Sequence, residues 1–229
     1  MHRYAIYFAP PRDHALWHAG CALLGRDPES GAALHLPSLP GIDPARVAAI
    51  TDEARRYGWH GTLKPPFALA EGTDAAGLHE ALVRFLAIQA PFPMPTLMLA
   101  PLSGFLAVIP AAPSEALASL AADCVRAFDA FRRPPSQAEL ARRRRSGLDE
   151  EEERNLARWG YPYVMERFRF HMTLSCKLDE PERSAVAAAI APRLADALAT
   201  PLLADAVALY GEPAPGAPFV LLARYGFGG

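Results

Sequence analysis

The chain has 229 residues, 51% of them hydrophobic and 21% charged, and its net charge is −2. This composition excludes a disordered chain. Proteins that bind long nucleic acids usually carry an excess of positive charge, which this chain lacks. No apolar run approaches the roughly 20 residues of a membrane helix, and the first residues alternate like a strand rather than a signal peptide, so we expect a cytoplasmic protein with no membrane partner.

Hydrophobic periodicity and turn residues predict the elements of the first half. A strand over residues 3–9 stops at Pro10-Pro11 and is followed by a helix over about 13–25. A second helix begins at the N-cap Asp43, with Pro44 in its first turn, and ends before Gly58. The next elements are a strand over about 59–70, a helix over 74–90 and two short strands within 96–110 around Ser103-Gly104.

The second half repeats this order. After a helix over about 114–132, Pro134-Pro135 opens a charged segment of helical composition over about 134–160, which we expect to be inserted into the core fold. A strand over 167–178, a helix over 181–199 and strands near 202–210 and 217–225 follow. Each half thus has a His-x-Thr-Leu strand, a helix and a hairpin. We expect one α+β domain over 1–229 with two pseudo-symmetric lobes around a central cleft, each an antiparallel sheet with helices on its outer face.

The two His-x-Thr-Leu strands carry the candidate site. His60-Gly61-Thr62-Leu63 and His171-Met172-Thr173-Leu174 lie 111 residues apart. Alternate residues of a strand share a face, so each histidine lies beside its threonine, with Lys64, Arg169 and Lys177 further along the same polar rows. One such tripeptide is typical of an exposed sheet face, but two copies at equivalent points of a repeat favour a functional site.

Phosphoryl transfer without a metal needs a base, an acid and donors for the phosphate oxygens. Two imidazoles that differ in protonation would supply the first two. We therefore predict His60 and His171 as the catalytic pair, and expect no metal or cofactor. Thr62, Thr173, Lys64, Arg169 and Lys177 are predicted to bind the substrate phosphate.

Other residues have weaker signals. Tyr4 and Tyr7 could stack on the substrate, although core packing is favoured for strand aromatics. Arg56 could contact phosphate or belong to a solvated helix end. Residues 142–145 could clamp a polyanion, but pairing with the acidic residues 150–153 on a solvated face is favoured. The segment 134–160 could also fold over the cleft as a lid. The remaining five histidines are assigned to structure or surface, and the three cysteines to reduced buried thiols.

Around these motifs the sequence resembles the two-histidine (2H) phosphoesterase superfamily, which carries HxT or HxS twice. The stretches RYAIYFAP, RRYGWHGTLKPPF and GYPYVMERFRFHMTL look like a narrower bacterial branch associated with phosphonate-utilisation operons. The resemblance implies a bilobal fold, a metal-free mechanism and a site at His60, Thr62, His171 and Thr173.

We therefore expect a metal-independent phosphodiesterase, a hydrolase acting on a small phosphodiester, with a cyclic one such as a nucleoside or ribosyl cyclic phosphate favoured. Two alternatives are an RNA end-processing or 2′-5′ ligase-like enzyme, which needs a basic track, and a non-catalytic nucleotide-binding module.

Overall fold

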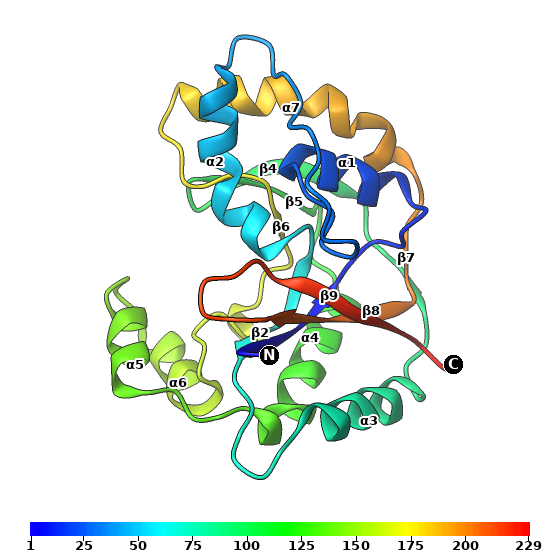
Figure 1. Ribbon diagram of the computed structural model, residues 1–229, viewed down its shortest axis with the longest axis vertical. Coiled ribbons are helices and arrows are strands. Elements are labelled where there is room, and N and C mark those ends of the chain that lie inside the picture. The colour runs from blue at the N-terminus through cyan, green and yellow to red at the C-terminus, as the bar shows by residue number, and fades with distance from the viewer.

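The computed structural model describes residues 1–229 and contains one main antiparallel sheet. Its seven strands follow the spatial order β4-β5-β6-β2-β1-β8-β9 (Figure 1). A separate two-stranded sheet pairs β3 with β7. The strands are β1 (Arg3–Phe8), β2 (Gly61–Phe67), β3 (Phe92–Pro93), β4 (Leu97–Leu102), β5 (Phe105–Pro110), β6 (Met172–Thr173), β7 (Leu203–Ala204), β8 (Ala206–Glu212) and β9 (Val220–Gly226).

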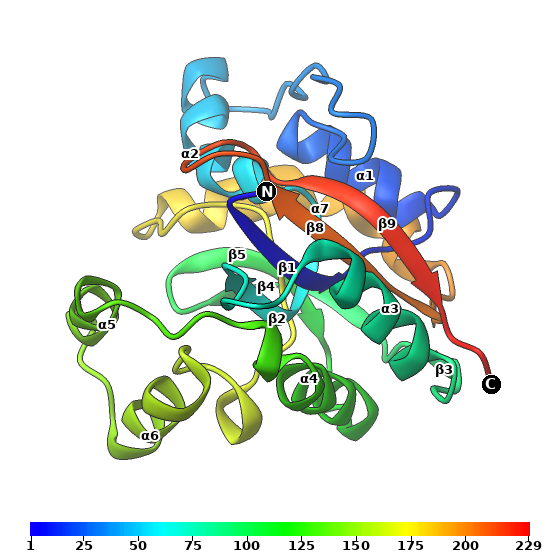
Figure 2. The same ribbon diagram turned by 60° about the horizontal axis from the view of Figure 1, so that its bottom comes forward.

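Helices cover both faces of the sheet. In both ribbon views α1, α2 and α7 lie on one side, α3 and α4 on the other, and α5 and α6 stand apart at one end (Figures 1 and 2). The bounds are α1 (Ala15–Leu24), α2 (Pro44–Tyr57), α3 (Ala75–Leu86), α4 (Glu115–Ala127), α5 (Gln137–Arg144), α6 (Glu150–Trp159) and α7 (Glu182–Ala199), with 3-10 turns at Asp129–Phe131 and Met165–Arg167. None of these helices is long and apolar enough to cross a bilayer.

The antiparallel α+β class and the order of elements confirm the sequence prediction. Each half runs from its HxT strand through a helix and a short strand to a hairpin, as β2-α3-β3-β4-β5 and β6-α7-β7-β8-β9. The division into two lobes, each with its own sheet, is not confirmed, because β2 and β6 pair directly and join all seven strands into one sheet. The hairpin β4-β5 pairs with β6, the strand of the other half.

The helix boundaries follow from local capping. The Asp43 carboxylate accepts from the backbone N–H groups of Ala45 and Arg46, and Gly58, with φ of +80°, ends α2 as predicted. In the charged segment, Ser136 with Glu139 and Asp149 with Glu152 each form a capping box. The segment 134–160 is therefore two short capped helices rather than one.

The strand predicted over residues 167–178 is wrong in length, because β6 covers only Met172–Thr173. The backbone N–H of Leu174 still donates to the Leu106 carbonyl oxygen, at 2.9 Å, but the Ser175 hydroxyl accepts from Leu106 N at 3.0 Å. A side chain thus replaces the backbone acceptor of the sheet. Cys176 N then donates to Ile50 O at 2.7 Å, which draws the chain away from the sheet toward α2.

Candidate functional site

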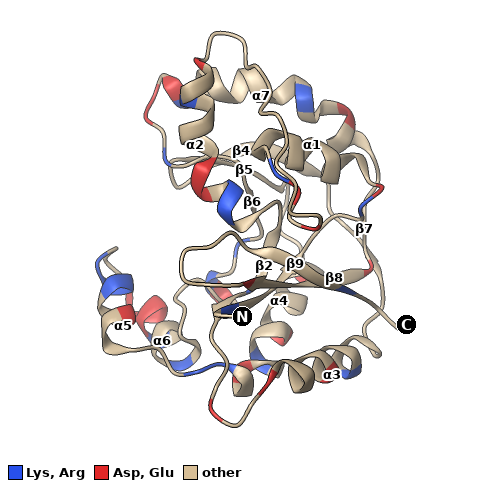
Figure 3. Cartoon of the chain, in the orientation of Figure 1, with Lys and Arg blue, Asp and Glu red and all other residues tan.

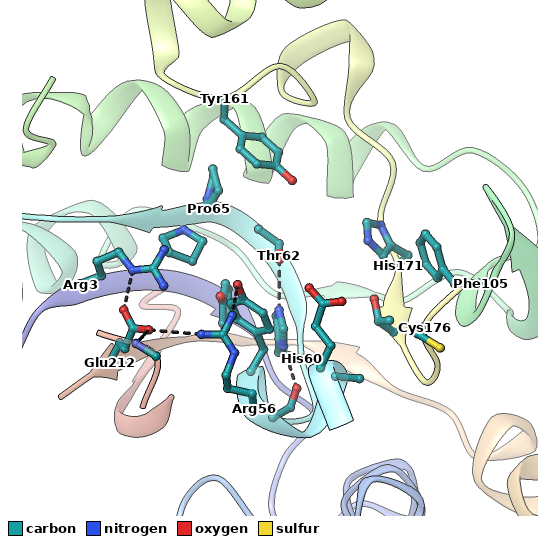
Figure 4. A pocket seen from close by; sticks show the side chains of 18 of the residues that line it. Arg3, Arg56, His60, Thr62, Pro65, Phe105, Tyr161, His171, Cys176 and Glu212 are labelled. Atoms are coloured by element: carbon teal, nitrogen blue, oxygen red, sulfur yellow. Dashed lines mark hydrogen bonds and ion pairs between the residues drawn. The ribbon is translucent and has the colours of Figure 1, made fainter. Parts of the chain in front are cut away.

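The two His-x-Thr motifs lie on neighbouring strands. Gly61 and Met172, the middle residues of the motifs, are paired across β2 and β6. A cavity of about 830 Å³ opens over this pair of strands. Seven of the predicted site residues line it: His60, Thr62, His171, Thr173, Lys177, Tyr7 and Arg56. The histidines and threonines that are far apart in the sequence therefore share one cavity (Figure 4).

Both imidazoles are oriented in the same way. His60 Nδ1 donates to the Gly58 carbonyl oxygen at 2.8 Å, and His171 Nδ1 donates to the Arg169 carbonyl oxygen at 2.7 Å. A carbonyl oxygen can only accept, so each Nδ1 carries the proton and each neutral ring keeps a free lone pair on Nε2. The Thr62 hydroxyl, 3.1 Å from His60 Nε2, then donates to that nitrogen.

The surroundings of the two rings favour the neutral form. Burial lowers the pKa of His60 from 6.5 to about 4, and the hydrogen bond to Gly58 offsets only part of this effect. The His60 ring stacks on Tyr7, with ring centroids 3.7 Å apart. Burial also lowers the pKa of His171, whose ring lies near Phe105. Both histidines are therefore neutral at pH 7 in the free protein, whereas the sequence suggested one neutral and one protonated ring.

Three predicted site residues lie outside this cavity. Arg169 is exposed and presents only its backbone carbonyl to His171. Tyr4 is buried in the core, which agrees with the packing role favoured for it. Lys64 is buried under α4, where its ammonium donates to the Val125 carbonyl oxygen at 3.1 Å and lies 3.8 Å from Asp129. These positions do not agree with phosphate contacts by the side chains of Lys64 and Arg169.

A bulge in β2 explains the position of Lys64. Tyr7 pairs with Thr62 but Ile6 pairs with Lys64, so Leu63 has no partner in the register. Because one extra residue reverses the alternation of faces, Lys64 points away from the cavity that Thr62 lines. A regular alternation, which the sequence analysis assumed, places the lysine on the wrong face.

A buried carboxylate that the sequence analysis missed fixes two arginines at the cavity. Glu212 has no exposed side-chain surface and accepts from Arg3 Nε at 2.5 Å and from Arg56 Nη1 at 3.4 Å (Figure 4). Burial opposes ionisation of Glu212, but the hydrogen bond and charge of Arg3 outweigh it, so its pKa is lowered. Arg56 also donates to the Tyr57 hydroxyl at 2.7 Å. The paired arginines are thus held in place rather than free to move.

The charged segment supplies further lining residues. Arg142 and Arg143 of α5 and Tyr161 after α6 border the cavity. Arg142, Arg144 and Arg145 are exposed, as the solvated face favoured for 142–145 predicts, whereas Arg143 is half-buried. Arg144, by contrast, pairs with Glu153 at 2.5 Å, as the charge pattern indicated. In Figure 4 the Tyr161 hydroxyl points across the cavity toward the side of the histidines. Contacts between segments distant in sequence create this wall, and no local motif marks it.

The cavity suits an anionic ligand. Its lining carries five cationic side chains, those of Arg3, Arg56, Arg142, Arg143 and Lys177, and three carboxylates, those of Glu53, Glu139 and Glu212. The excess of two positive charges contrasts with the net charge of −2 of the chain. The two threonine hydroxyls of the cavity can donate to phosphate oxygens, and each imidazole Nε2 accepts a proton and, once protonated, donates to a phosphate oxygen. No group of three or more His, Cys, Asp or Glu side chains is arranged to hold a metal ion.

A family model described as "Protein of unknown function (DUF1045)" matches residues 62–220 of the chain. The chain is 40% identical over its whole length to a protein of Janthinobacterium sp. (strain Marseille) named ribose 1,5-bisphosphate phosphokinase PhnN. It is 41% identical, over 96% of its length, to a protein of the same name from Laribacter hongkongensis (strain HLHK9). The matches cover 51% and 50% of these proteins, so the chain spans about half the length of the curated relatives it matches.

These names overturn one prediction. The predicted activity was that of a hydrolase, a two-histidine phosphodiesterase with His60 and His171 as acid and base, whereas both relatives are named as a kinase. The prediction rested on the pair of motifs. Two imidazoles beside a phosphate can bind it as well as act as acid and base, so the motifs alone do not identify the reaction.

Proposed function

Because this chain belongs to the family described as protein of unknown function (DUF1045), we propose a function from its cavity: it binds a small phosphorylated sugar, with one phosphate between His60 and His171. The name of the relatives supports a ribose phosphate as the ligand class. The sequence resemblance to the phosphonate-utilisation branch of the two-histidine superfamily supports a role in phosphonate metabolism.

The pairing of Gly61 with Met172 is the observation that carries this proposal. It brings two imidazoles and two hydroxyls together on adjacent strands, in a cavity with excess positive charge. A phosphate presents oxygens in several directions, and hydroxyl donors on two strands can meet them from two sides. Lys177, which is exposed and has no carboxylate partner, adds a mobile charge at the same cavity.

The proposal concerns the sugar phosphate rather than a nucleotide phosphate donor. A P-loop needs a glycine-rich turn followed by Gly-Lys and Ser or Thr. The two lysines of this chain follow Leu63 and Cys176, so the motif is absent from its 229 residues.

Calorimetric titration of the purified chain tests the proposal. The panel consists of ribose 5-phosphate, ribose 1,5-bisphosphate, ribosyl cyclic phosphate and unphosphorylated ribose. We expect binding of phosphorylated ribose but not of ribose, and a loss of at least about tenfold in affinity in His60→Ala and in His171→Ala, because each removes a group beside the phosphate. His35→Ala is the matched control, since His35 is exposed and lies outside the cavity. Absence of binding of every phosphorylated ribose by the folded chain refutes the proposal.

A further inference from the structure

A second cavity of about 470 Å³ opens beside the two-histidine cavity. The two share the side chains of His2, Arg3, Glu139, Arg142 and Arg143 in their walls. A ligand that extends past the histidines along this wall therefore enters the second cavity. Its remaining wall comes from the end of β2, from residues 132–136, which precede α5, and from Gly160 after α6.

The second cavity is lined by five arginines and one carboxylate, Glu139. Arg3 and Arg132 are already paired, with Glu212 at 2.5 Å and Asp129 at 2.8 Å. Arg133, Arg142 and Arg143 have no carboxylate partner within 4.0 Å. In Figure 3 the backbone is blue, the colour of Lys and Arg, along the segment before α5 and on α5 itself. We call Arg133, Arg142 and Arg143 the arginine pocket.

Glu139 offsets only part of the charge of the arginine pocket: hydrogen bonds from Ser136 and the charges of Arg133 and Arg142 lower its pKa, but it is one carboxylate beside three guanidinium groups. Its Oε2 accepts from the Ser136 backbone N at 2.8 Å and from the Ser136 hydroxyl at 2.9 Å, as part of the capping box of α5. The carboxylate is thus held against its own helix N-terminus, where backbone donors already satisfy it. Three guanidinium groups, always charged in proteins, remain available to an external anion.

The pocket is partly positioned before any ligand arrives. The Arg143 guanidinium lies over the Tyr161 ring, 4.5 Å from its centroid. Arg133 is tied to the end of β2 through its backbone, because its N–H donates to the Ala68 carbonyl oxygen at 2.8 Å. The like charges repel one another, and a doubly charged anion between them removes that repulsion and gains charge-assisted hydrogen bonds.

We propose that the arginine pocket binds the second phosphate of a bisphosphorylated sugar whose first phosphate lies between His60 and His171. This inference rests on the proposed function, and it adds a selectivity: the chain prefers a bisphosphorylated ligand to a monophosphorylated one. The continuous wall of the two cavities and the three unpaired arginines carry it.

Titration of ribose 5-phosphate and ribose 1,5-bisphosphate into the parent chain and its variants Arg133→Gln, Arg142→Gln and Arg145→Gln tests the inference. Arg145 is the matched control, because it is exposed, adjacent in sequence and outside both cavities. We expect the parent to bind the bisphosphate at least about tenfold more tightly, since each charge-assisted hydrogen bond to phosphate contributes about that factor or more. Arg133→Gln should lose most of this preference and keep the affinity for ribose 5-phosphate, because Arg133 lines the second cavity alone. Arg142→Gln should weaken the bisphosphate more than ribose 5-phosphate, since Arg142 lines both cavities, and Arg145→Gln should keep both affinities.

The outcomes separate the two proposals. If the parent binds both ligands equally, or if Arg145→Gln loses the preference as much as Arg133→Gln, the arginine pocket is refuted and the two-histidine site stands. If Arg133→Gln weakens ribose 5-phosphate as strongly as the bisphosphate, a single phosphate occupies the arginines and the assignment of two sites is wrong. If the folded parent binds neither ligand, both proposals fall.

Discussion

Protonation of His60 should make the folded chain sensitive to acid. Its pKa is lowered from 6.5 to about 4 by burial, so between these values the unfolded chain binds more protons than the folded one. Stability from this residue is complete above about pH 6.5 and is lost as the pH falls toward 4. With about 1.4 kcal/mol per pKa unit, the loss between pH 7 and pH 4.5 is at most about 2.5 kcal/mol. The solvent-filled cavity beside the ring reduces this figure.

Urea unfolding of the parent and of His60→Gln at pH 7 and pH 4.5 measures this effect. Gln cannot titrate, so we expect the variant to lose about 1–2 kcal/mol less than the parent over this interval, whatever its stability at pH 7. His35→Gln, which changes an exposed histidine, should follow the parent. An equal loss in the parent and in His60→Gln would refute the reasoning that burial holds this imidazole neutral.

Three further predictions concern the groups around the cavity. Burial lowers the pKa of Lys64 to about 8, so Lys64→Met should raise the free energy of unfolding at pH 7 by up to about 3 kcal/mol. The parent's stability should rise between about pH 8 and 10.5, and the variant's should not. Ligand affinity in titrations should be unchanged. Glu212→Gln should lower the free energy of unfolding by about 3 kcal/mol in urea, because it leaves Arg3 without its countercharge; an unchanged value would contradict this role. In Gly61→Ala the new Cβ meets the Phe170 ring at 2.5 Å, so we expect a loss of about 1–3 kcal/mol, partly recovered when Phe170→Leu is added.

The sequence was sufficient to predict the order of the secondary-structure elements and that the two motifs share one site. Local signals determine these features: Asp43-Pro44 and Gly58 bound α2, and the alternation over residues 171–173 places His171 and Thr173 at the cavity, although the same alternation wrongly added Arg169. The repeated element order also showed that His60 and His171 occupy equivalent strands. Local patterns, together with the repeated order of elements, were therefore enough to predict that the two histidines lie close together.

The rest of the site depends on irregularities and distant contacts. The bulge at Leu63 turned Lys64 away from the cavity, and the Ser175 hydroxyl ended β6 early. Glu212 is 209 residues away from Arg3 in the sequence, although the two side chains are hydrogen-bonded beside the cavity. Arg142 belongs to a charged helix whose composition is typical of a solvated face, and the tertiary fold places it in the walls of both cavities. No local pattern encodes any of these features.

The central claim is that a phosphate of a sugar ligand lies between the two imidazoles. The most direct test follows the side-chain nitrogen resonances of His60 and His171 by NMR during titration with ribose 5-phosphate, with His35 as the internal control. We predict that the Nε2 resonances of both His60 and His171 shift with one common affinity while those of His35 stay constant. Saturable binding that leaves the Nε2 resonances of His60 and His171 unchanged would contradict the account.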